Sequence, residues 1–263
     1  MPASQASAEP THRPNTVLRV LVAATVVATI VMNYLANAVP FFGRGTGEVS
    51  AVYPTLVTPA GYVFAIWGLI YLGLITYSVA QFLKPLASDP LPDALAWPLI
   101  VSSVANVVWL LLWQSLNIYW SVPVMLVLLG SLIVAHRVSR KDRPGRPSVS
   151  EQWTVRAPIG LYLGWVSVAT IANVSSALYA AEWNGWGIPA EWWGVTVLIV
   201  GATLAFLGLV RENDGVFAGV FVWAFAGIAA ATPSSLVAMA GNALAIVVAV
   251  GIVVSVIVRR PRA

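Results

Sequence analysis

The chain has 263 residues, of which 59% are hydrophobic and 9% are charged, with a formal net charge of +4 at pH 7. A soluble domain carries about 25% charged residues, so this composition excludes a soluble globular protein. Its apolar runs are nearly continuous, whereas the strands of a transmembrane β-barrel alternate apolar and polar residues. The sequence therefore predicts an all-α integral membrane protein.

The first 15 residues are rich in proline, serine and alanine, and we expect a disordered tail there. Eight apolar runs follow, each close to the length of about 20 residues that a membrane-spanning helix needs. They lie at about 16–42, 58–82, 97–117, 119–137, 156–181, 192–211, 215–232 and 235–258. The first run, with two arginines before it and Ala36-Asn37-Ala38 within it, has a signal peptide as its alternative. The sequence therefore predicts eight transmembrane helices.

Basic residues give the orientation of these helices. If both termini are cytoplasmic, all of the 14 lysines and arginines except Arg44 fall on the inner side, as the positive-inside rule expects. The excess of basic residues therefore reflects membrane topology, and we expect no nucleic-acid partner. The prediction is a multi-pass protein with cytoplasmic termini, in a bacterial plasma membrane.

Charged and nucleophilic groups are scarce inside the runs. No Asp, Glu, Lys or Arg lies in the middle of a run, which argues against proton pumps and ion-coupled transporters. The chain has no cysteine and its two histidines, His12 and His136, are far apart, so we expect no covalent cofactor and no metal site. His136 is expected to be an interfacial histidine and not a haem ligand. No nucleophile–base pair is present within a run, so an enzyme is not expected.

Twelve tryptophans are the unusual feature of the sequence. Several lie at the ends of runs, where an interfacial belt explains them. Others form stripes at helical spacing on the second, third and fifth runs, and two stripes include an asparagine. The stripes consist of Phe64, Trp67 and Tyr71; Asn106, Trp109 and Trp113; and Tyr162, Trp165, Ala169 and Asn173. They predict a concave pocket in the outer half of the membrane for a flat apolar ligand, with ordinary aromatic packing as the alternative.

The segment from Gly43 to Val57 is too polar to span the membrane and too long for a tight turn. We expect a glycine-rich loop on the same side as the stripes, where it closes over the pocket as a lid. Tyr53 and Pro54 are its expected contact points, with simple surface packing as the alternative.

These stripes, with Pro59 before the first, resemble the tryptophan-rich sensory protein family (TspO/MBR), whose animal members are the translocator or peripheral benzodiazepine receptor proteins. The motifs are Phe64-x-x-Trp67-x-x-x-Tyr71, Asn106-x-x-Trp109 and Tyr162-x-x-Trp165-x-x-x-Ala169-Thr170-x-x-Asn173. The resemblance covers about residues 16–180. It implies a five-helix bundle under a long first loop, which binds a tetrapyrrole such as protoporphyrin or haem, or a sterol-like lipid, non-covalently.

Three further helices are expected at 191–258. Gly194, Gly201 and Gly208 recur every seven residues, and Gly215 and Gly219 form a small-xxx-small pair. We expect these glycines to allow close packing within the chain, with a homodimer interface as the alternative. The predicted organisation is a tail at 1–15, a ligand-binding bundle at 16–183 and a three-helix extension at 191–258.

The sequence thus predicts a membrane ligand-binding or sensory protein that holds a flat apolar ligand in an aromatic pocket. A small-molecule transporter or permease is the alternative, because eight helices exceed what the resemblance requires. The missing intramembrane charges and the lack of an obvious inverted repeat count against it.

Overall fold

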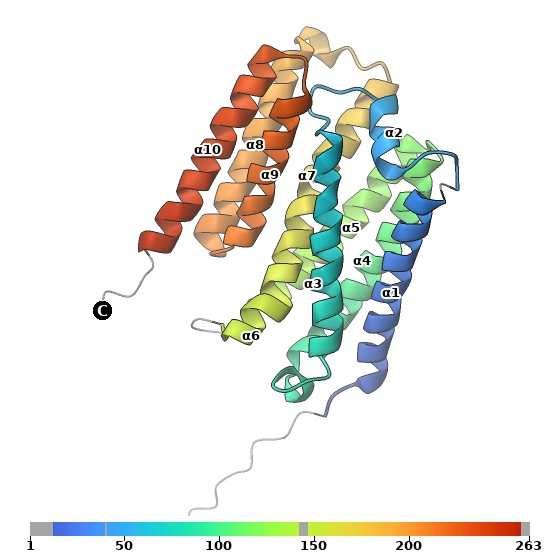
Figure 1. Cartoon of the computed structure of the whole chain (residues 1–263), viewed down its shortest axis with the longest axis vertical. Helices are drawn as coiled ribbons and strands as arrows, with labels where there is room; N and C mark the ends of the chain where they lie inside the picture. Colours follow the sequence, from blue (N-terminus) through green and yellow to red (C-terminus); the bar gives the residue numbers. More distant parts are fainter. Residues whose placement is uncertain (1–12, 40, 142–146, 259–263) are drawn as a thin grey trace, which may run out of the picture.

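The computed structural model describes residues 13–39, 41–141 and 147–258. Within these ranges every regular element is helical, in agreement with the predicted all-α class (Figure 1). The predicted tail at 1–15 falls almost wholly outside the described residues. The long helices are α1 (Thr16–Ala38), α3 (Ile66–Ala80), α4 (Leu91–Gln114), α5 (Ile118–Val138), α7 (Ala157–Ala180), α8 (Ala190–Arg211), α9 (Gly215–Ala231) and α10 (Ser235–Val258).

Each predicted apolar run overlaps one of these long helices. Among the described residues, seven helical stretches are long and apolar enough to cross a membrane, and one of them joins the 3₁₀ helix η1 (Gly61–Ala65) to α3. The helix α9 is also apolar but has 17 residues, a length of about 26 Å at 1.5 Å per residue. It therefore comes close to the roughly 30 Å thickness of the hydrocarbon core.

Consecutive long helices alternate in direction. The helices α1, α4, α7 and α9 begin at one end of the molecule, where α3, α5, α8 and α10 finish (Figure 1). The short helix α2 (Thr46–Val52) lies at the opposite end, which we call the α2 end. Because the start of α1 and the finish of α10 share an end, an even number of crossings fits the architecture.

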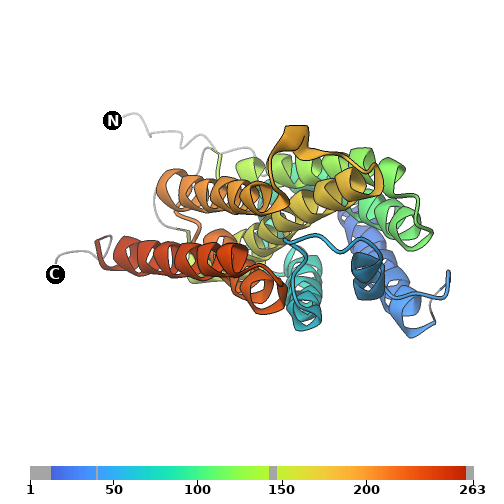
Figure 2. The ribbon, with the colours of Figure 1, turned by 90° about the horizontal axis from the view of Figure 1, so that it is seen from above.

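The helices form two units that meet at α7. The helices α1, α3, α4, α5 and α7 make one bundle, while α8, α9 and α10 lie side by side on its flank (Figure 2). Glycines on α8 face α9 and α10: a Cβ at Gly194 would meet Val237 at 2.9 Å, and one at Gly201 would meet Phe225 at 3.1 Å. The glycine stripe is therefore used for packing within the chain.

Hydrogen bonds also join η1 to α9. The amide of Ala60 donates to the carbonyl oxygen of Gly227 at 3.1 Å, and Trp223 Nε1 donates to the carbonyl oxygen of Val63 at 3.0 Å. A Cβ at position 227 would overlap the Val63 side chain, so only glycine permits this approach. These contacts fasten the start of the second apolar run to the flanking unit.

Buried charge is concentrated at the end opposite α2, which we call the charged end. Arg19, near the start of α1, is 2% exposed and donates to Asp93 Oδ1 at 2.7 Å. Its guanidinium also donates to four backbone carbonyl oxygens at 2.8 to 3.2 Å, those of Gln81, Leu86, Ala87 and Asp89. The loop that leads from α3 to α4 is thus wrapped around one arginine.

A second charged cluster ties α5 to α9. Asp214, the N-cap of α9, is 2% exposed and accepts hydrogen bonds from His136 Nε2 at 2.9 Å and Arg140 Nη2 at 2.6 Å. Burial by itself raises the pKa of Asp214, but the hydrogen bond from His136 and the charge of Arg140 bring that pKa below its ordinary value.

His136 lies in the last turn of α5, at the helix end where the sequence places it, but its side chain is covered by protein. This histidine is 6% exposed, because the start of α9 covers the end of α5 where the sequence placed water or headgroups. Its Nε2 is bonded to Asp214, and it lines neither of the two cavities described below.

The segment 43–57 also differs from the expected loop, since it contains α2. Asn37 Oδ1 accepts a hydrogen bond from the amide of Thr46 at 3.1 Å, and Glu48 Oε2 accepts one from the amide of Gly45 at 2.9 Å. These two side chains satisfy amides at the start of α2 that a helix leaves without partners. The segment is therefore an ordered cover.

Candidate functional site

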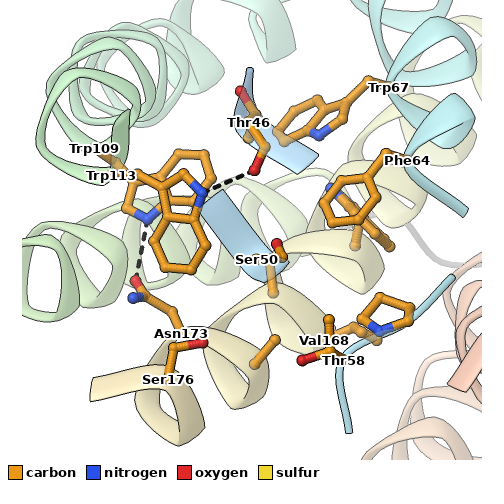
Figure 3. Close-up of a pocket in the computed structure, with 14 residues that line it drawn as sticks. Thr46, Ser50, Thr58, Phe64, Trp67, Trp109, Trp113, Val168, Asn173 and Ser176 are labelled. Atoms are coloured by element: carbon orange, nitrogen blue, oxygen red, sulfur yellow. Dashed lines mark hydrogen bonds between the residues drawn. The ribbon is translucent and has the colours of Figure 1, made fainter. Parts of the chain in front are cut away.

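A small cavity lies at the α2 end between α2, η1, α3, α4 and α7 (Figure 3). Its volume is about 40 Å³. The walls are mainly aromatic or small apolar side chains, with a few hydroxyl and amide groups. They are formed by Thr46, Ser50, Thr58, Pro59, Phe64, Trp67, Trp109, Trp113, Trp165, Val168, Ala169, Ala172, Asn173 and Ser176. We call this space the aromatic cavity.

The aromatic rings form two groups on facing walls. On α4, Trp109 and Trp113 are stacked, with ring centroids 5.7 Å apart and 23° between their planes. Opposite them, Trp165 meets Phe64 edge to face at 5.7 Å and Trp67 at 6.3 Å. Offset and edge-to-face pairs are the favoured arrangements of aromatic side chains. The cavity thus has preformed flat walls.

Two of the indoles are held by hydrogen bonds to the frame of the bundle. Trp109 Nε1 donates to Asn173 Oδ1 at 3.1 Å, and the amide nitrogen of Asn173 donates to Ser121 Oγ at 2.8 Å. This relay links α4, α7 and α5 and fixes which way the asparagine points. Trp113 Nε1 instead donates to the carbonyl oxygen of Thr46 at 3.0 Å (Figure 3). Trp113 therefore connects the wall of the cavity to its cover, α2.

The third wall tryptophan has a free donor. Trp165 is 2% exposed, and its Nε1–H has no hydrogen-bond partner among the described residues. A buried donor without a partner costs about 1–3 kcal/mol. An acceptor atom on a molecule inside the cavity would recover that cost.

The structure brings most of the predicted site residues together. Seven of the ten stripe residues line the aromatic cavity: Phe64, Trp67, Trp109, Trp113, Trp165, Ala169 and Asn173. The other three lie behind the lining. Tyr71 stacks on Trp67 at 5.6 Å, Tyr162 meets the same ring at 5.9 Å, and Asn106 accepts a hydrogen bond from Asn33 at 2.8 Å. These three residues support the walls.

The two expected lid contacts lie elsewhere. Pro54 lines a second cavity, and Tyr53 lines neither. The cover of the aromatic cavity is α2, through Thr46 and Ser50. Three further lining residues of α7 were not expected from the sequence, namely Val168, Ala172 and Ser176. They follow Trp165 at successive helical steps of three and four residues, but none of them is aromatic.

The size of the aromatic cavity limits what it holds in this conformation. A volume of about 40 Å³ has room for one or two water molecules. Pockets for drug-sized ligands span about 300–1,000 Å³. A larger ligand therefore requires displacement of α2, whose packing is mainly against α4.

A family model described as TSPO-like protein matches residues 19–254 of the chain. This match includes α8, α9 and α10, which the resemblance to five helices left outside. Searches of curated proteins and of solved structures found no match. Because the family model covers most of the chain, the protein belongs to the TSPO-like family and is an integral, multi-pass membrane protein.

Proposed function

We propose that this TSPO-like protein is a membrane ligand-binding or sensory protein whose aromatic cavity takes a flat apolar molecule. Family membership favours this class of function, and the walls built from Trp67, Trp109 and Trp165 offer ring faces for stacking. Contacts of this kind are worth about 1–3 kcal/mol per aromatic residue by the scale of base stacking. Protoporphyrin, or a sterol-like lipid, is the ligand class that the sequence resemblance implies.

The free Nε1–H of Trp165 is the observation that carries this proposal. Burial of this donor without a partner costs free energy, which an acceptor on a bound molecule would return. A ligand with a carbonyl or carboxylate oxygen, or a ring nitrogen, would accept this hydrogen bond while its apolar body lies between the walls. We therefore propose Trp165 as the residue that orients the ligand.

A metal-free ring suits this lining better than haem. The lining offers indole, phenyl, hydroxyl and amide groups, and none of its residues is histidine, methionine or cysteine. Haem iron takes its axial ligands from imidazole, thioether, thiolate or phenolate groups. We propose stacking and one hydrogen bond as the means of binding, with no bond to a metal.

Binding starts with the movement of α2. In the closed state the hydrogen bond from Trp113 to the Thr46 carbonyl holds the cover down. When α2 lifts, the ligand slides between the ring walls, and the Trp109–Asn173–Ser121 relay keeps the opposite wall in place. Closure then excludes water and headgroups from the bound molecule.

Titration with protoporphyrin tests this proposal. Binding to the purified protein should quench the intrinsic tryptophan fluorescence and shift the Soret band of the porphyrin. Trp165→Phe keeps a ring in the wall but removes the donor, so it should weaken binding about fivefold. Trp97→Phe is the matched control, because Trp97 is 61% exposed and lines neither cavity. No quenching and no Soret shift in the wild-type protein would overturn the tetrapyrrole proposal.

The competing transporter function requires access to the ligand from both ends of the bundle. Both cavities described here lie at the α2 end, while buried charge clusters close the opposite end. This arrangement supports binding without flux. Uptake of protoporphyrin into proteoliposomes, above the level of protein-free vesicles, would favour the transporter instead.

A further inference from the structure

A second and larger cavity lies where the two helical units meet at the α2 end. Its volume is about 460 Å³, which is within the range of pockets for small molecules. We call it the seam cavity, because its walls come from the segment 54–57, the end of α7 and the start of α8. None of the residues that line it is charged. A ligand for this cavity therefore needs no charged group.

One wall of the seam cavity is an ordered aromatic cluster. The rings of Trp183, Trp186 and Trp193 lie 5.1 to 5.8 Å from one another, and Trp193 Nε1 donates to the carbonyl oxygen of Gly185 at 2.9 Å. Gly185 has φ +63° and its Cα faces the Trp193 ring, so glycine is needed there on both counts. Of these rings, Trp183 and Trp193 line the cavity. Flat ring surfaces are thus fixed in place before any ligand arrives.

The depth of the seam cavity indicates an amphipathic ligand. Its lining reaches Ser175, five residues before the last residue of α7, and Val197, seven residues into α8. At 1.5 Å per residue the cavity extends about 7–10 Å below the helix ends. Asn184, which also lines the cavity, lies at the rim in the connection between the two helices, where its Oδ1 accepts a hydrogen bond from the amide of Trp186. The apolar depth and the amide at the rim fit a molecule with an apolar body and one polar end.

The seam cavity and the aromatic cavity lie on two sides of shared walls. In the extended segment, Pro54 to Val57 line the seam cavity, whereas Thr58 and Pro59 line the aromatic cavity. On α7, Ser175 belongs to the seam cavity, while Ala172 and Ser176 belong to the aromatic cavity. Each site can therefore be altered without touching the other.

We infer that the seam cavity is a second binding site, which takes a small uncharged amphipathic molecule with a flat ring body. The ring lies against Trp183 and Trp193, and the polar end meets Asn184 at the rim. Unlike the aromatic cavity, this site has the volume for such a ligand without any movement of α2. The inference does not depend on what the aromatic cavity binds.

Prodan, a flat uncharged naphthyl ketone, is a suitable probe for the seam cavity. Excitation of tryptophan should give saturable energy transfer to prodan in protein-containing nanodiscs, above the signal of empty nanodiscs. Ser175→Phe fills the cavity from α7 and should weaken prodan binding about tenfold. The substitution removes only a hydrogen bond to Ile171 within the same helix. Tyr179→Ala, at a half-exposed position of the lining, is a second variant that opens the wall instead.

Two matched variants separate the outcomes. Ala172→Leu, one turn from Ser175, faces the aromatic cavity and should leave prodan binding unchanged while it weakens protoporphyrin binding. Val200→Phe lies on an exposed face of α8 and should change neither. If Ser175→Phe behaves like Val200→Phe, the seam cavity is not a binding site. Displacement of prodan by brominated lipid chains would show that lipid occupies the cavity, which also overturns the inference.

Discussion

The two ends of the molecule differ in what they enclose: the charged end buries ionised side chains, and the α2 end contains the two cavities. At the charged end, Arg19 and Asp214 each have several hydrogen bonds to neighbouring elements. At the α2 end, Trp165 has a buried donor without a partner among the described residues, and both cavities lie there. One end is therefore built as a rigid base and the other as an end that can change. The predictions below test this contrast, from the largest expected effect to the smallest.

The largest loss of stability should come from Arg19→Met. This substitution removes the guanidinium that donates to Asp93 Oδ1 and to four backbone carbonyl oxygens. Removing one partner of a buried ion pair costs about 3–5 kcal/mol in the free energy of unfolding. Thermal unfolding of the purified protein measures this loss. Arg211→Met, at an exposed position, is the control and should be nearly neutral. Equal effects of the two substitutions would contradict the rigid base.

Asp214→Asn should cost somewhat less, about 3 kcal/mol, because a neutral amide still accepts hydrogen bonds from His136 and Arg140. The pKa of Asp214 is lowered in the folded state, so the carboxylate adds stability above its ordinary pKa. That stability is lost as the pH falls below about 4. Melting temperatures measured as a function of pH should therefore fall less steeply in acid for the variant. If the melting temperatures of the two proteins fall equally steeply below about pH 4, Asp214 does not have this role.

Trp113→Phe should act on rates at the α2 end with little effect on stability. The phenyl ring can still pack against Trp109, but the hydrogen bond to the Thr46 carbonyl is lost and α2 lifts more easily. We expect protoporphyrin to associate and dissociate about fivefold faster, as the loss of one hydrogen bond predicts. Stopped-flow quenching measures both rates. Trp109→Phe is the comparison variant, because Trp109 Nε1 donates to Asn173 and not to α2. Its loss should change the affinity for protoporphyrin without making α2 lift more easily.

The smallest effect should come from Tyr53→Ala. Tyr53 follows the last residue of α2 and lines neither cavity. Rates of protoporphyrin release should therefore change less than about twofold, within the range of substitutions away from a site. A release rate as fast as that of Trp113→Phe would mean that the segment after α2, and not α2 itself, is the moving part.

Much of the fold followed from apolar periodicity alone, because a membrane requires long apolar helices. The errors lie at the ends of helices. The helix α4 begins at Leu91, six residues before the predicted run, since Pro92 and Asp93 fit the first turn of a helix but lower the local hydropathy. The helix α2 was missed because the glycines at 43, 45 and 47 favour a loop, and the side chain of Asn37 that helps to start it is distant in sequence.

The candidate site was predictable where rings recur on one helix face. Residues that reach the cavity through tertiary structure were not, such as Thr46 and Ser50 on α2. The partnership of His136 with Asp214 was also hidden, because the two are 78 residues apart and belong to different units. Spacing along one helix reports which residues share a face, but it does not report what covers that face.

The bonds between η1 and α9 limit how this chain could be shortened. A fragment ending near residue 183 would lack Gly227, so the amide of Ala60 would lose its acceptor, at a cost of about 1–3 kcal/mol if it stays buried. The same cut would remove Asp214 from His136 and Arg140. Phe64 lies on η1, so this wall of the aromatic cavity would no longer be held against α9. The last three helices and the wall of the aromatic cavity therefore depend on each other, and separating them would expose bonded groups of both.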